Sequence, residues 1–263
     1  MLKSAFAASA AIIILSASAS AQEGGAPDFV ALGVATAPDH PGSDEYRILP
    51  FGAGRVRLGE VVLQVEGPGL SAAFLDTGRV EAGAYARWYG GRDSDIDDPV
   101  VRLLPEADGG AVLGGFVRVL AARGLTSDFD RVYLSARAGA DVTGEYDGLF
   151  WSASAAWTAP LSPTTLFIAN LSVSGTPDSY ADRLFSVDAV GFAASGLPVH
   201  TAEGGIQDIG VTLFLDQQVS ENWSVTGVLG ASRLQGDYAD SPIVTVRGSD
   251  TPVFAGIAIG RRF

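Results

Sequence analysis

The chain has 263 residues, contains no cysteine and carries a formal net charge of −13 at pH 7. This acidic balance argues against a nucleic-acid partner, because binding would need a run of cationic side chains to neutralise phosphates. The lack of cysteine excludes disulfide bonds as a source of stability. After the first 21 residues, no apolar run reaches the roughly 20 residues that a membrane-spanning helix needs.

The first 21 residues have the pattern of a cleavable secretory signal. Lys3 supplies the positive start, an apolar stretch runs from Ala5 to Leu15, and Ala19-Ser20-Ala21 offers the small side chains of a cleavage site. The apolar stretch is too short to cross a bilayer core of about 30 Å as a helix, which disfavours a retained anchor. We therefore predict a signal peptide at 1–21 and one β-barrel domain at 22–263, exported to the outer membrane of a Gram-negative cell.

Segments in which polar and apolar side chains alternate recur along the rest of the chain. Alternation with a period of two predicts β-strands, and turn residues such as Gly, Pro, Asn and Asp separate the segments. In 131–141, for example, Arg131 and Arg137 share one face while Ala136 lies on the other. The predicted strands are 28–36, 46–57, 60–66, 69–75, 79–89, 111–122, 131–141, 149–159, 164–174, 206–217, 223–233 and 252–263.

The strand count depends on Gly67-Pro68-Gly69, which forms a turn if there are twelve strands and lies within one strand if there are eleven. A single-chain bacterial barrel has an even number of strands, with short turns in the periplasm and long loops outside. The chain meets both conditions only with twelve strands. The long loops are then 37–45, 90–110, 175–205 and 234–251. Within 175–205, the stretch 185–195 is a candidate for a short helix or an extra strand, and the loop is long enough to fold back into the mouth.

The chemistry of the two strand faces distinguishes a membrane barrel from a soluble sandwich, which also alternates. One face carries charges of both signs, and the other is apolar with tryptophans near the predicted strand ends, as expected for a polar lumen and a lipid-facing wall. We therefore predict an all-β, antiparallel transmembrane barrel. Its charges either line a water-filled pore or pair across the lumen and plug it, and the narrowness of twelve strands favours the plug. The predicted lumen-lining residues are Arg79, Glu81, Arg87, Arg131, Arg137, Asp141, Asp208 and Asp216.

Residues suited to catalysis or metal binding are sparse. Only two histidines occur, His40 and His200, and neither lies in a His-x-Ser element of the kind that a barrel lipase would use. Both fall in predicted loops and are interpreted as surface histidines. The carboxylates of 93–98 lack the glycine and the closing glutamate of an EF-hand calcium loop. They are interpreted as solvated charge, with loose divalent-cation binding as the alternative. We predict no catalytic, cofactor-binding or metal-binding residues and no enzymatic activity.

Several short motifs, taken in order, resemble the MltA-interacting protein family, also called MipA/OmpV. Residues 33–50 pair an AP-D-x-x-GS loop with a YR-x-LP strand, which resembles the opening of that family. One departure is Arg261, which stands where terminal strands of such barrels usually carry an apolar or aromatic residue. The remaining motifs, which extend the resemblance over almost the whole mature chain, are Asp97-Asp98-Pro99, Ser195-Gly196-Leu197-Pro198, the stretch from Ser232 to Val244, Gly248-Ser249 and Arg262-Phe263.

This resemblance implies a structural and interaction role. The founding member of the family is understood as a scaffold that links a murein lytic transglycosylase with a penicillin-binding protein. The implied partners are these two enzymes, outer-membrane lipid and lipopolysaccharide, and the barrel-assembly machinery through the strand that ends at Phe263. No cofactor is implied. The residues also leave open an alternative function, a small pore for solutes across the outer membrane.

Overall fold

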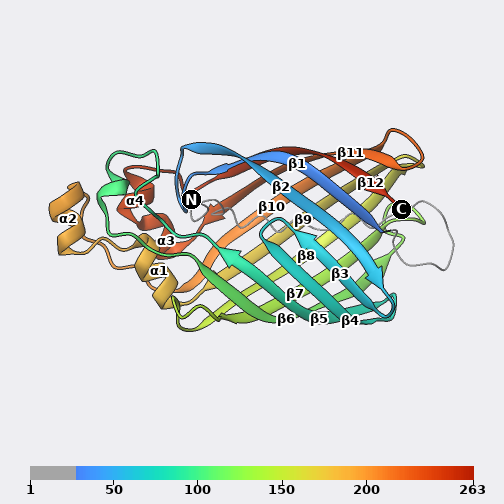
Figure 1. Cartoon of the computed structure of the whole chain (residues 1–263), viewed down its shortest axis with the longest axis horizontal. Helices are drawn as coiled ribbons and strands as arrows, with labels where there is room; N and C mark the ends of the chain where they lie inside the picture. Colours follow the sequence, from blue (N-terminus) through green and yellow to red (C-terminus); the bar gives the residue numbers. More distant parts are fainter. Residues whose placement is uncertain (1–27) are drawn as a thin grey trace.

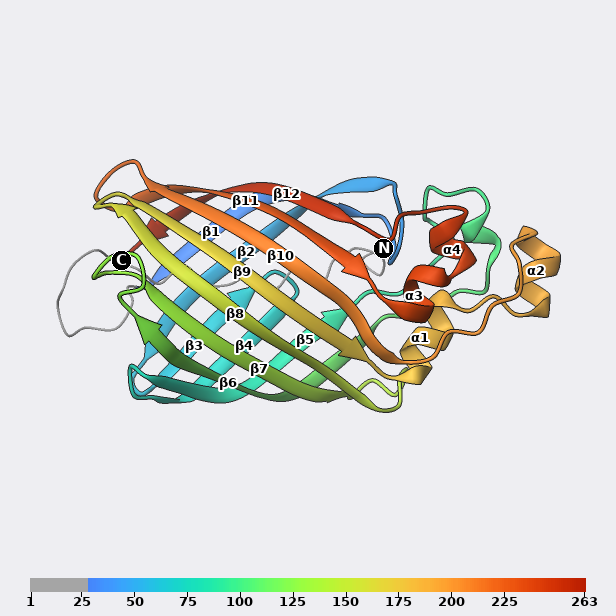
Figure 2. The ribbon, with the colours of Figure 1, turned by 180° about the vertical axis from the view of Figure 1, so that it is seen from behind.

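The computed structural model describes residues 28–263, which form a closed barrel of twelve antiparallel strands (Figures 1 and 2). Each strand pairs with its neighbours in sequence, and β1 pairs with β12 to close the ring. The strands are β1 (Phe29–Pro38), β2 (Tyr46–Leu58), β3 (Val61–Glu66), β4 (Gly69–Asp76), β5 (Val80–Tyr89), β6 (Gly110–Arg123), β7 (Arg131–Asp141), β8 (Leu149–Ser162), β9 (Thr165–Thr176), β10 (Gly205–Gln218), β11 (Trp223–Leu234) and β12 (Val253–Arg262).

The predicted fold class and the prediction of twelve strands are thereby confirmed. Gly67 and Pro68 form the turn on which the count depends, since β3 ends at Glu66 and β4 begins at Gly69. All twelve predicted strands overlap the observed ones. The predicted signal peptide lies outside the described residues.

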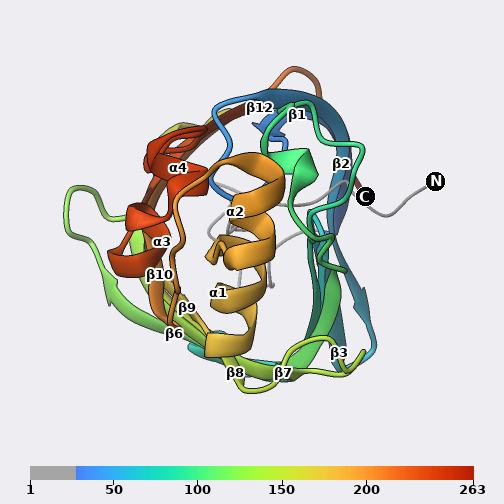
Figure 3. The same cartoon turned by 90° about the vertical axis from the view of Figure 1, so that its left-hand side faces the viewer.

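The two ends of the barrel differ in the length of their connections. One end, here called the loop end, carries the short helices η1 (Val101–Leu103), α1 (Asp178–Phe185), α2 (Ala189–Ser195), α3 (Gly236–Asp240) and α4 (Pro242–Thr245). Figure 3 looks onto this end and shows α1 and α2 in front of the barrel opening. The opposite end, the turn end, has only short connections. Within the stretch 185–195, residues 189–195 form the short helix α2, and Val187 makes only an isolated β-bridge to His200. Among residues 28–263, no helix combines the length and apolar character needed to cross a membrane.

Side chains alternate between the interior and the outer wall, as the pleat of a strand requires. In β12, Ile257 and Ile259 are exposed while Ala258 between them is buried. The apolar outer wall that results is the surface that a barrel presents to lipid. Two tryptophans lie toward each end of the strands, Trp88 and Trp151 at the loop end and Trp157 and Trp223 at the turn end, where indoles suit the headgroup level of a bilayer.

The seam between β1 and β12 is closely packed around one glycine. Gly33 pairs with Ala258 across the seam. A Cβ atom at position 33 would collide with the backbone of Ile257 and Ala258. Glycine is therefore the residue that allows the first and last strands to approach each other here.

Candidate functional site

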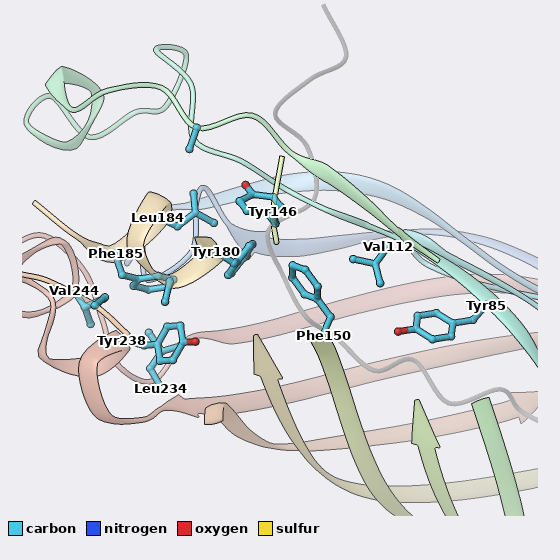
Figure 4. Close-up of a cluster of buried hydrophobic side chains, with 13 residues drawn as sticks. Tyr85, Val112, Tyr146, Phe150, Tyr180, Leu184, Phe185, Leu234, Tyr238 and Val244 are labelled. Atoms are coloured by element: carbon cyan, nitrogen blue, oxygen red, sulfur yellow. The ribbon is translucent and has the colours of Figure 1, made fainter. Parts of the chain in front are cut away.

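The five long connections at the loop end, residues 39–45, 90–109, 142–148, 177–204 and 235–252, pack into one body that we call the mouth cap. Its centre is a cluster of aromatic rings (Figure 4). The ring of Tyr180 in α1 lies edge-on to those of Tyr146 and Phe150, at centroid distances of 5.0 and 5.5 Å. Phe185 packs on Tyr238 at 5.1 Å. The 177–204 loop is therefore anchored on the mouth through the apolar face of α1.

A buried arginine joins two parts of the mouth cap. The guanidinium of Arg92 donates hydrogen bonds to the carbonyl oxygens of Leu184 at 2.8 Å and Pro105 at 3.1 Å. Only 4% of Arg92 is exposed, and burial lowers its pKa to about 10. Because a buried cation without partners would be costly, these carbonyl groups fix the position of α1 above the barrel.

The prediction that both histidines lie at the surface is wrong for His40. This side chain is buried, and its Nδ1 lies 3.0 Å from the carbonyl oxygen of Pro41. Burial lowers the pKa of the His40 imidazole, and the charge of Arg92 acts in the same direction. The physical reason is that loop 90–109 covers loop 39–45, a long-range contact that local sequence does not reveal. His200 is half-buried, with its Nε2 3.0 Å from the carbonyl oxygen of Asp237.

The contact between these two loops also gathers acidic groups. Carboxylate oxygens of Asp39, Glu45 and Asp97 all lie within 4.8 Å of one another, and the Asp97 amide donates to Asp39 Oδ2 at 2.7 Å. Burial, followed by the nearby carboxylates, raises the pKa of Glu45. Asp98 is only 3% exposed, so the interpretation of 93–98 as solvated charge is wrong at that position.

Inside the barrel, paired charges occupy the side formed by β2 to β7. Glu81 of β5 forms ion pairs with Arg55 of β2 and Arg118 of β6. Nearby, Arg137 of β7 pairs with Glu66 of β3 at 2.7 Å. Both carboxylates are buried. Opposite charges from different strands therefore satisfy one another across this side of the lumen.

The predicted lumen-lining residues fall into three zones. Those that lie within the barrel, away from its ends, are Glu81, Arg87, Arg137, Asp208 and Asp216. Asp216 pairs with Arg262 at 2.6 Å, and Asp208 accepts a hydrogen bond from the Ser174 hydroxyl at 2.6 Å. Asp141 lies at the loop end of β7 and accepts amide hydrogen bonds from residues 143, 145 and 146. Arg79 and Arg131 are exposed at the turn end. A role for any of these residues in lining a pore stays a prediction.

The opposite side of the lumen is apolar, and here a cavity remains. The cavity has a volume of about 80 Å³ and is partly open to the outside. Sequence reasoning missed this cavity because it assigned the apolar face of each strand to lipid. The sequence feature that could have indicated the cavity is the set of phenylalanines on the inward-facing positions of the strands. The inward-facing side chains that line it include Phe29, Ala31, Phe51, Ala53, Phe214, Val228, Phe254 and Ala258.

The barrel wall is incomplete beside this cavity. β3 and β4 have 6 and 8 residues, whereas β2 has 13, so the β3–β4 hairpin ends part-way along the barrel (Figure 1). The last contacts of its turn are Gly67 N to Gly52 O at 3.2 Å and Trp88 N to Pro68 O at 3.0 Å. Beyond them, residues 46–51 of β2 have β1 as their only paired strand in the described chain. We call this gap the wall opening.

The wall opening and the cavity are continuous. Pro50, on the free edge of β2, lines the cavity together with Gly67 and Pro68 of the hairpin turn. Toward the loop end, the Arg47 guanidinium donates a hydrogen bond to the carbonyl oxygen of Asp95 at 2.6 Å. A contact between β2 and loop 90–109 therefore lies above the opening.

A closed ring of twelve antiparallel strands, with an apolar outer wall and ion pairs inside, defines a β-barrel protein of the outer-membrane type. The family model described as MltA-interacting protein MipA matches residues 30–263. The chain belongs to this MltA-interacting protein family, which confirms the resemblance found in its motifs.

The solved structures that match this chain are distant from it. In vitro-folded OmpT, an outer membrane protein of Vibrio cholerae, is 9% identical over 81% of this chain, with a TM-score of 0.39, and the chain spans 64% of its length. A CymD monoaromatic hydrocarbon channel is 11% identical over 90% of this chain and 88% of its own, with a TM-score of 0.41. OprB of Pseudomonas putida is 12% identical over 82% of this chain and 56% of its own, with a TM-score of 0.40. A comparison with curated protein sequences gives no significant match.

Proposed function

We propose that this protein is a non-enzymatic barrel of the outer membrane that holds enzymes of the murein sacculus at its periplasmic turn end. In this proposal the signal peptide at 1–21 directs export, and the mature barrel binds a lytic transglycosylase and a penicillin-binding protein. Membership of the MltA-interacting protein family supports the choice of partner. Within residues 28–263, the contrast between a capped loop end and a turn end with short connections supports the choice of surface.

The longest turn-end connection, residues 124–130, is the best candidate for the attachment point. Asp130 is fully buried and accepts hydrogen bonds from the Leu125 and Thr126 amides at 2.8 and 2.7 Å, and from Trp157 Nε1 at 3.1 Å. Burial would raise the pKa of the Asp130 carboxyl, but the hydrogen bonds from Thr126, Trp157 and Leu125 together lower it well below its usual range. An ionised, multiply bonded carboxylate therefore holds this turn in one shape at neutral pH.

This rigid turn presents two apolar side chains. Leu125 is 63% exposed and Phe129 is 61% exposed. Because these side chains are already ordered in the free barrel, less conformational entropy is lost when a partner binds them. A standard interface buries about 800 Å² on each partner, so we expect neighbouring turns to contribute as well.

The chemistry of the histidines supports a non-enzymatic role. A serine-dependent hydrolase needs a histidine that hydrogen-bonds the nucleophilic hydroxyl. The ring nitrogens of His40 and His200 that make hydrogen bonds within residues 28–263 face the carbonyl oxygens of Pro41 and Asp237. Neither contact activates a nucleophile.

A pull-down with the folded barrel and the lytic transglycosylase of the same bacterium tests the proposal. We expect Leu125→Ser with Phe129→Ser to reduce retention of the enzyme at least tenfold. The control is Leu161→Ser at the next turn-end connection, where Leu161 is 62% exposed, and it should retain more enzyme than the double variant. Equal retention by both variants would rule out the 124–130 turn, and no retention by the unmodified barrel would rule out the scaffold.

The alternative function is a small pore, which the charged side of the lumen favours. The mouth cap opposes it, because α1 and the aromatic cluster cover the mouth. Planar-bilayer recordings separate the two functions. A scaffold with a capped mouth should give little or no stable conductance, whereas a pore should conduct in steady, discrete steps.

A further inference from the structure

We propose that the cavity on the apolar side of the lumen binds a small, uncharged apolar molecule that enters from the membrane through the wall opening. The inference uses the proposed membrane placement of the barrel and is independent of the scaffold role.

The lining of the cavity selects for apolar ligands. Phenylalanines from four strands surround small side chains such as Ala31 and Ala258, and these small residues leave the space unfilled. Among the lining residues within 28–263, only Thr36 and Thr226 carry a side-chain polar group, and none is charged. A lining of this kind favours a small apolar molecule, because it offers almost no hydrogen bonds to a polar ligand or to water.

The free edge of β2 has one backbone donor fewer than an ordinary open strand edge. Gly52 accepts the Gly67 amide, so its peptide groups point toward β3. Residues two apart on a strand direct their peptide groups to the same side, so the backbone nitrogen of Pro50 faces the opening, as does the N–H of Ile48. A residue with an N–H there would leave a donor unpaired at the edge, which is costly in hydrocarbon. Proline has no N–H and is tolerated at a sheet edge.

The surroundings of the cavity disfavour an ionic ligand and a route from the loop end. At the rim, the charge of Arg47 is paired with Asp39 and its guanidinium also donates to the Asp95 carbonyl, so this cation is not free to bind an anionic headgroup. The mouth cap covers the axial entrance. An apolar molecule dissolved in the membrane needs no charged partner, and at the wall opening it does not have to pass the mouth cap.

Two sources supply such chemistry, the acyl chain of a membrane lipid and a free apolar solute, and fluorescence quenching distinguishes them. The four native tryptophans are replaced by phenylalanine, and Phe254→Trp places one reporter in the cavity of the barrel in phosphatidylcholine vesicles. Acyl-brominated phosphatidylcholine tests entry of a lipid chain. Bromobenzene, added to ordinary vesicles, tests entry of a solute, and aqueous iodide tests entry of water.

We expect the reporter at 254 to be quenched by at least one brominated probe, several-fold more strongly than by iodide. Ala258→Leu in the same background should remove that quenching by filling the cavity. The lumen control Phe116→Trp, on the opposite side, should be quenched by neither brominated probe. If Phe254→Trp prevents folding, as judged by heat-modifiable mobility in gels, Phe214→Trp gives the same readout from β10.

The outcomes are distinguishable. Quenching at 254 by brominated lipid identifies an acyl chain as occupant, and quenching by bromobenzene alone identifies a solute. No quenching by either brominated probe, or quenching by iodide alone, would overturn the proposal. The outward control Ile257→Trp reports the membrane placement separately, since brominated lipid should quench it whether or not the cavity is occupied.

Discussion

Arg247 Nη2 lies 2.7 Å from Asp98 Oδ2, and this ion pair joins two loops of the mouth cap whose residues are 149 positions apart. Asp98 also accepts the Val101 amide at 2.8 Å. Burial would raise the pKa of the Asp98 carboxyl, but the hydrogen bonds from Arg247 and the backbone lower it further than burial raises it. Because the folded-state pKa is depressed, the stabilisation is present above the unfolded pKa of about 3.9 and is lost as pH falls through the folded value.

Removing the charge of Asp98 should therefore loosen the mouth cap at neutral pH. We expect Asp98→Asn to make cap opening easier, because the charged acceptor of the Arg247 guanidinium and of the Val100 and Val101 amides is lost. Faster tryptic cleavage at Arg102 or Arg247 would show this. Arg233→Gln is the control, since Arg233 and Asp250 are exposed and 3.7 Å apart, and such pairs contribute about 0–1 kcal/mol. Equal cleavage of both variants would contradict the role of the buried pair.

A charge on the outer wall should harm the barrel more than a charge inside it. Leu171 of β9 is 55% exposed on the outer wall, whereas Ser172 lies on the inward register and pairs with Gly210. We expect Leu171→Arg to cost about 2–4 kcal/mol in lipid and Ser172→Arg to cost less, because Asp208 is close on the inner face. Urea unfolding in vesicles measures both. A larger loss for Ser172→Arg would mean that this strand has the opposite register.

The buried His40 should make the mouth cap sensitive to acid. Its pKa is lowered in the folded cap, by burial first and by Arg92, although Asp39 and Asp98 act in the opposite direction. As pH falls below the unfolded value of about 6.5, the open state gains a proton that the closed cap does not, so the cap loses stability. Hydrogen exchange of residues 39–45, corrected for its intrinsic pH dependence, should be faster at about pH 5.5 than at neutral pH. His40→Gln should remove that difference, and a variant that retained it in full would exclude His40 as its source.

Cysteine labelling should locate the two ends of the barrel. The chain has no native cysteine, so Ser94→Cys in the mouth cap and Ser162→Cys at the turn end provide single reporters, both at exposed positions. An impermeant thiol reagent added to intact cells should label position 94 and leave position 162 unlabelled. Disruption of the outer membrane should make both accessible. The reverse pattern in intact cells would invert the barrel and remove the periplasmic attachment surface.

Local pattern was enough to predict the strands, because a period of two and the turn residues between segments determine where each strand begins and ends. The turn at Gly67-Pro68 could be predicted for the additional reason that closure into a single-chain bacterial barrel requires an even count. The burial of His40 and Asp98 could not be predicted in this way, because each side chain is buried by contacts between loops that are distant in sequence. The cavity was missed for a related reason, because an alternating pattern identifies two faces but not an apolar patch on the inner one.

The shortness of the β3–β4 hairpin gives the β1–β12 seam a mechanical role. Among the described residues, the backbone of 46–51 in β2 pairs only with β1, and β1 pairs in turn with β12. A displacement of the seam would therefore be passed on to the free edge. Gly33 sets the closest approach of β1 and β12 at this seam. A side chain at position 33 would push β1 away from β12. Because β1 carries the free edge of β2, this displacement would change the width of the wall opening.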